Sequence, residues 1–317
     1  MSDIRCSEIA ATEALAGTAP YRRVWFIIEQ PGAWGADALT QSDLPAGFGE
    51  ELKKLLEGTD VGVALARRPD IASVERRTTR RRRLWLAHTS PGGVRMRAGS
   101  LDDIREVLKW DWQAILRGEL PPVGRRSADP VLFVCTNGKK DVCCALKARE
   151  IVDALRPDPE LTGQVYECSH LTGHRFAPTA LLLPTGHVYG RLDLERTRSV
   201  LNAAWSGQVV PEHLRGRTSL PGWAQSAEIA VRTTEHVTAA DALDVVVLRN
   251  GKPMPATLNP AFDTALTIQV RHADGRSWDV PVTAMELAER KVSCNGIPEP
   301  GVSWIADRPV EAQAWHS

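Results

Sequence analysis

The segment from residue 128 to residue 207 alternates short apolar runs with helical periodicity, in an order that restricts the possible folds. The predicted strands are 128–135, 163–169, 180–184 and 187–192, and the predicted helices are 142–155 and 195–207. The elements therefore follow one another as β-α-β and then β-β-α. This is the order of a thioredoxin-like core, in which an open α/β sheet places ligands at the ends of its strands.

The first 116 residues repeat this order with little sequence identity. The predicted strands are 22–30, 61–68, 83–89 and 94–99, and the predicted helices are 47–58 and 101–116. The expected fold class is α/β, with two tandem thioredoxin-like lobes and a small β-rich C-terminal appendage. The expected domains are a lobe at 1–120, a second lobe at 128–207, and the appendage at 208–317. The first lobe is expected to be degenerate, because its loop 31–40 has no Cys or His.

The appendage shows one clear hairpin signal and one segment without regular pattern. Apolar alternation on both sides of Asp274-Gly275 predicts two antiparallel strands joined at that turn. The segment 289–304 shows no such alternation and is expected to be irregular.

Two cysteines and two histidines of the second lobe lie in segments that read as loops at strand ends. Cys135 and Cys144 are spaced C-x8-C, and His170 and His174 are spaced H-x3-H. Two thiolates and two imidazoles make a four-ligand set that can hold a [2Fe–2S] cluster or a zinc ion. Zinc is the weaker interpretation, since zinc fingers separate their paired cysteines by two to four residues.

The other cysteines suggest structural roles. The chain has six cysteines, too few for a disulfide scaffold at 317 residues, and it has no C-x-x-C motif. Cys143 adjoins Cys144 on a helix and differs from it by about 100° in direction, so one of them should face the loop and the other the core. We interpret Cys143 and Cys168 as small buried hydrophobic residues.

Composition excludes several classes of partner. The 39 basic and 39 acidic residues give a formal net charge of zero, so no global field favours nucleic acid or an anionic membrane. Six arginines in 76–83 form a basic run, which we interpret as a solvated segment, with docking of an acidic protein as the alternative. No apolar run approaches a membrane span, and the N-terminus has no signal-like apolar core. A cytoplasmic protein is expected.

Two stretches carry a resemblance to a known family. They are VLFVCTNGKKDVCCALKAREIV (131–152) and VYECSHLTGHRFAPTALLLPTGHVYGRL (165–192), with weaker echoes over 6–35. The chain resembles the sucrase/ferredoxin-like family of thioredoxin-like [2Fe–2S] proteins, and its H-x3-H is similar to the bis-histidinyl, non-Rieske branch. The resemblance implies that Cys135 and Cys144 bind one iron and that His170 and His174 bind the other.

The implied function is one-electron transfer, coupled to protons through the imidazoles, with a redox partner protein as donor or acceptor. Histidine ligation raises the potential in Rieske centres to about −150 to +300 mV, against about −400 mV for plant-type ferredoxins. Reduction should also raise the pKa of the second imidazole nitrogen. An electron carrier is expected rather than an enzyme, and no sucrase activity is expected, because no carboxylate pair fits glycoside hydrolysis. A redox or pH sensor and a structural zinc protein remain alternatives.

Overall fold

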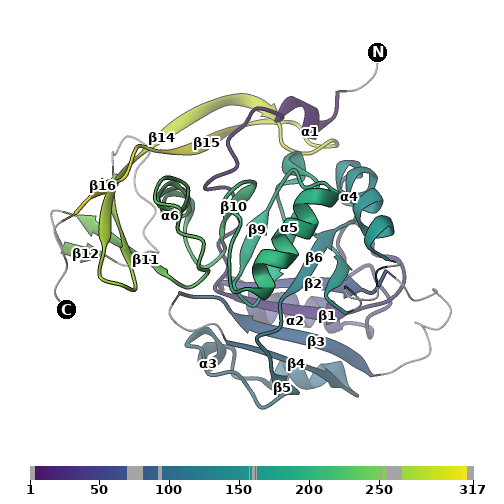
Figure 1. Cartoon of the computed structure of the whole chain (residues 1–317). Coiled ribbons are helices and arrows are strands. Elements are labelled where there is room, and N and C mark those ends of the chain that lie inside the picture. Colours follow the sequence, from purple (N-terminus) through teal and green to yellow (C-terminus); the bar gives the residue numbers. More distant parts are fainter. Residues whose placement is uncertain are drawn as a thin grey trace.

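The computed structural model describes residues 4–69, 81–91, 95–156, 158, 161, 163–249, 252–254 and 266–312. Most of the arginine run at 76–83 lies outside these residues, as do residues 92 and 93, between the strands predicted at 83–89 and 94–99. In the described part of the chain, no helix is long and apolar enough to cross a membrane. Figure 1 shows two sheets with a few short helices packed on them.

A curved ten-stranded sheet forms the larger part of the molecule (Figure 1). In order across the sheet, its strands are β10 (Leu214–Arg217), β9 (His187–Tyr189), β8 (Ala180–Leu183), β6 (Val131–Cys135), β7 (Val165–Cys168), β2 (Val61–Arg67), β1 (Val24–Glu29), β3 (Arg82–His88), β4 (Arg95–Leu101) and β5 (Arg125–Arg126). The mixed α/β class is thus confirmed. β10 lies in the range predicted for the appendage and pairs with β9 in this sheet.

The two halves of this sheet have the same strand order and the same strand directions. In the first half β1 pairs with β2 in parallel and with β3 antiparallel, and β3 pairs with β4 antiparallel. In the second half β6 pairs with β7 in parallel and with β8 antiparallel, and β8 pairs with β9 antiparallel. The halves join where β2 meets β7, with Ala66 opposite Cys168. One continuous sheet therefore places the end of β6 near the middle of the molecule.

The helices cover this sheet separately in each half. α2 (Phe48–Leu56) packs on the first half, and α4 (Val142–Leu155) and α5 (Leu194–Trp205) pack on the second. The prediction of a single helix at 101–116 is wrong. The segment forms a 3₁₀ helix, η2 (Ile104–Lys109), and then α3 (Trp112–Leu116). Extended backbone at Trp110 breaks the helix, and the Asp111 side chain caps the new one by accepting from Ala114 N–H.

The concave face of the sheet is filled by large side chains from both halves. Trp85 of β3 packs edge-on against Phe133 of β6, with ring centroids 5.2 Å apart, and against Tyr166 of β7, at 4.6 Å. All three rings are buried. Burial of apolar surface at about 25 cal/mol per Å² makes this shared core a main source of cohesion between the halves.

The C-terminal region is β-rich, as expected, and forms a second, antiparallel sheet. Its strands are β12 (Lys252–Met254), β11 (Leu243–Arg249), β13 (Leu266–His272), β14 (Ser277–Lys291), β15 (Pro298–Ala306) and β16 (Val310–Glu311). The predicted hairpin at Asp274-Gly275 joins β13 to β14. α6 (Gly222–Thr234) packs against this sheet through Trp223, Ala227 and Val231.

The prediction that 289–304 is irregular is wrong, because most of this segment belongs to the long β14–β15 hairpin. Most side chains near the hairpin's tip are exposed or half-buried, so the strands lack the alternation of apolar and polar residues that marks a half-buried strand. The hairpin extends back over the molecule to the short helix α1 (Cys6–Ile9), as Figure 1 shows.

Candidate functional site

Cys135 is the last residue of β6 and lies in the interior, with 1% of its surface exposed. Its backbone N–H donates to Thr179 O at 2.9 Å, which ties it to the segment before β8. The chain then turns, and the backbone N–H of Asn137 donates to the Cys135 sulfur. The end of the strand therefore presents a buried thiol with a backbone donor already directed at it.

The start of α4 brings Cys144 to the same place. The Asp141 side chain caps the helix by accepting from Cys143 N–H at 2.9 Å, and this fixes the direction of the first turn. Hydrogen bonding with Cys144 and His170 lowers the pKa of Cys135, although burial opposes it. The same contact with Cys135, together with burial, raises the pKa of Cys144. The two thiols therefore lie close together.

The histidine pair comes from the loop after β7 and the 3₁₀ helix η4 (His174–Phe176). The two imidazole rings stack, with centroids 4.3 Å apart and an angle of 18° between the planes. His174 Nδ1 lies 3.5 Å from Cys144 Sγ. Burial and the nearby His170 lower the pKa of His174 to about 4, which keeps this imidazole neutral at physiological pH. A neutral imidazole is the form that binds metals.

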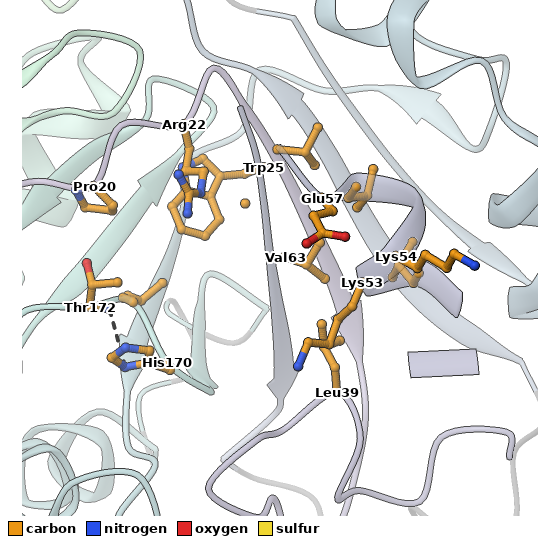
Figure 2. Close-up of a pocket in the computed structure, with 15 residues that line it drawn as sticks. Pro20, Arg22, Trp25, Leu39, Lys53, Lys54, Glu57, Val63, His170 and Thr172 are labelled. Atoms are coloured by element: carbon orange, nitrogen blue, oxygen red, sulfur yellow. Dashed lines mark hydrogen bonds between the residues drawn. The ribbon is translucent and has the colours of Figure 1, made fainter. Parts of the chain in front are cut away.

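His170 differs from His174 in its access to solvent. It is half-buried and borders a pocket of about 580 Å³ that also touches Trp25, Lys53 and Glu57. Figure 2 shows His170 at one side of this pocket, with Thr172 N–H donating to its Nδ1 at 3.4 Å. The structure therefore brings all four sequence-predicted residues together, three of them buried and His170 next to open space.

Arg215 of β10 is a buried residue near the site that the sequence did not reveal. Its side chain is fully enclosed, and Nη1 donates to Thr172 O at 3.1 Å while Nη2 donates to Thr18 O. Burial lowers the pKa of Arg215, and the Cys144 and Cys135 thiolates oppose this shift. The site thus has a buried cation close enough to its thiols for their charges to interact. The hydrogen-bond partners of Arg215 lie 40 or more residues away in the chain, so no local sequence pattern indicates that this arginine is buried near the site.

The remaining residues singled out in the sequence fall outside the four-residue group. Arg175, which follows His174 directly and could have contacted the thiols, instead pairs with Glu13 at 3.0 Å. Lys139 and Lys140 are exposed on the loop after β6, at the rim of the site. Cys168 is packed in β7, as predicted. Cys143 is buried too, but it contacts the sulfur atoms of two further cysteines.

The fold and the site define an α/β protein in which two thiols and two imidazoles lie together, all buried except the half-buried His170. The chain belongs to the sucrase/ferredoxin-like family, whose model matches residues 15–216. Over 83 residues it is 32% identical to altered inheritance of mitochondria protein 32 of Eremothecium gossypii, an alignment covering 26% of this chain and 25% of that protein. The chain thus spans about a quarter of this curated relative's length. No solved structure gave a significant match.

Proposed function

We propose that Cys135, Cys144, His170 and His174 hold a [2Fe–2S] cluster and that the protein transfers single electrons, each coupled to a proton. The observation that carries the proposal is the convergence of two thiols and two imidazoles in one buried place. Thiolate and imidazole are the donors found in histidine-ligated iron–sulfur centres. When bound, the cluster would supply the one-electron acceptor.

The surroundings of the four residues suit a negatively charged centre. The Asn137 N–H donates to the Cys135 sulfur, and the buried Arg215 guanidinium is close enough to attract negative charge on both sulfurs. Both groups stabilise negative charge on sulfur, and such contacts tune the potential of iron–sulfur sites. The arrangement fits the group that the family name suggests.

The two histidines would have different roles. His174 is enclosed and neutral, so it serves as a fixed ligand. His170 borders the pocket of Figure 2, so a proton leaving its second nitrogen has a short route to water. We infer that His170 is the group through which protons follow the electron.

We further propose that the two halves of the sheet are thioredoxin-like lobes, of which only the second carries the cluster. Support comes from their shared strand order and directions. The exposed Lys139 and Lys140 at the rim would meet acidic side chains on a redox partner protein. Such a carrier needs no substrate site of its own.

A redox titration of the anaerobically purified protein from pH 6 to pH 10 tests this function. The midpoint potential is expected to fall with rising pH above neutrality, because reduction raises the pKa of a ligating imidazole. His170→Cys should flatten this dependence, since a thiolate has no second proton to lose. A potential that is flat over the whole range would refute proton coupling. A colourless protein that contains zinc at these residues would refute the cluster.

A further inference from the structure

A second group of metal-binding side chains lies beside the first, and neither the family nor the proposed function accounts for it. It consists of Cys6 of α1, Asp141 before α4, Cys143 of α4, and Cys294 between β14 and β15. Their ligand atoms all lie within 4.8 Å of one another. The residues come from both ends and the middle of the chain, so only the folded protein assembles them.

The sulfur–sulfur distances match those around a tetrahedral metal ion. Cys143 Sγ lies 3.2 Å from Cys294 Sγ, Cys6 Sγ lies 3.5 Å from Cys294 Sγ, and Cys6 Sγ lies 3.7 Å from Cys143 Sγ. Zinc–sulfur bonds of about 2.3 Å in a tetrahedron place sulfur atoms about 3.8 Å apart. Three sulfurs therefore already form a near-equilateral triangle of almost the required size, while all the cysteines are free thiols.

Asp141 completes the set, and two backbone N–H groups stabilise its carboxylate. Its carboxylate is buried, and its oxygens accept backbone N–H groups from Cys294 at 2.7 Å and from Cys143 at 2.9 Å. Each oxygen keeps a second lone pair. Cys6 Sγ lies 3.8 Å from Oδ2, close to the separation of about 3.6 Å expected for sulfur and oxygen on one zinc ion. A cation bound here would offset the cost of burying this carboxylate among thiols.

We propose that Cys6, Asp141, Cys143 and Cys294 form a second metal site, which binds Zn²⁺ and holds the fold together. Three thiolates favour zinc over magnesium or calcium, and four protein ligands leave no open position, as in structural zinc sites. Binding releases the thiol protons to solvent and involves no redox change.

The bound ion would link segments near the two ends of the chain, and we call this linkage the clasp. The ion would join α1, the first turn of α4 and the tip of the β14–β15 hairpin, which lie together in Figure 1. Glu13 reinforces the same junction, because its carboxylate pairs with Arg175 at 3.0 Å and with Arg290 at 2.6 Å. Since Cys143 and Cys144 are neighbours on α4, the clasp also holds the helix turn that carries a residue of the first site.

The test is metal analysis of the full chain, purified anaerobically with reductant, with cobalt substitution as a probe. We expect one zinc ion per chain. Protein stripped of metal and titrated with Co²⁺ should show thiolate-to-cobalt absorption and the visible bands of tetrahedral Co²⁺. Cys294→Ser should weaken zinc binding by more than about 100-fold, because even residues outside the ligand shell contribute 10- to 100-fold. Ser293→Ala, a neighbouring change at the same hairpin tip, should leave binding unchanged.

A reciprocal variant separates this site from the first. Cys144→Ser removes a residue of the first site, so zinc retained by this variant belongs to the second, whatever the first site binds. Retention of zinc in Cys144→Ser and its loss in Cys294→Ser support the proposal. Wild-type protein without zinc and without thiolate–cobalt absorption overturns it, as does a Cys143–Cys294 disulfide found by mass spectrometry after purification with reductant.

Discussion

Gly173 lies between the two histidines in a position where the structure has no room for a side chain. Its φ of +76° is in the left-handed region. A Cβ atom there would lie 2.7 Å from Arg215 Cζ and 2.9 Å from Nη1, and still closer to Nη2. The Gly173→Ala substitution must therefore both strain the backbone and displace the buried guanidinium.

The expected cost has two parts that a control variant separates. Left-handed backbone costs an alanine about 1–2 kcal/mol. Displacing Arg215 disrupts its hydrogen bonds to Thr172 O and Thr18 O, and bonds to a charged group contribute about 1.5–3 kcal/mol each. Gly207 has a similar φ of +67° and nothing within 4 Å of a Cβ. Gly207→Ala should therefore cost about 1–2 kcal/mol, and Gly173→Ala should cost at least about 3 kcal/mol more.

Urea unfolding of the metal-free proteins at pH 7.5 measures this difference. Tryptophan fluorescence and far-UV circular dichroism should report the same transition, so that a single free energy of unfolding is defined. Equal losses of stability in the two variants would refute the claim that Arg215 is packed against the histidine loop.

Three further predictions rest on buried charges. Glu228→Gln should lower the free energy of unfolding by about 3–5 kcal/mol, because it leaves the buried Arg232 without its anionic partner at 2.8 Å; thermal unfolding measures the loss. In the metal-free protein, His174 has a folded pKa of about 4 against an ordinary 6.5, so the unfolded chain takes up the proton first. The free energy of unfolding should therefore fall by about 3 kcal/mol as the pH falls from 6.5 to 4. Urea unfolding at several pH values measures this decline, which should be shallower in His174→Gln. Glu13→Gln removes the partner of two arginines and should speed amide exchange in α1 and at the hairpin tip without changing exchange in β6; unchanged exchange at the tip would show that these two ion pairs do not hold the hairpin against α1.

The candidate site was predictable because its residues lie at the ends of elements with clear periodicity. The apolar run ending at Cys135 and the helical spacing from 142 onward are enough to predict both thiols at one edge of a sheet. The histidine loop follows the neighbouring parallel strand and meets the same edge. The local apolar pattern and the order of the elements are therefore sufficient to predict such a site.

The residues that were missed depend on contacts between distant segments. Arg215 reaches the site from a strand beyond the predicted lobe, and Cys6 and Cys294 meet only because a long hairpin returns to α1. That hairpin was not predicted because most of its side chains near the tip are exposed or half-buried, so its sequence carries no alternating pattern. The aromatic core shared by the halves likewise depends on the pairing of β2 with β7.

The central claim is that the two histidines and two cysteines hold one cluster, and EPR of the dithionite-reduced protein tests it most directly. The wild type is expected to show the average g value of a histidine-ligated [2Fe–2S] centre. His170→Cys and His174→Cys should each shift it toward the value of all-cysteine clusters, whereas His236→Cys, at an exposed position, should leave it unchanged. Spectra that are identical in the wild type and both site variants would remove the histidines from the site and contradict the account.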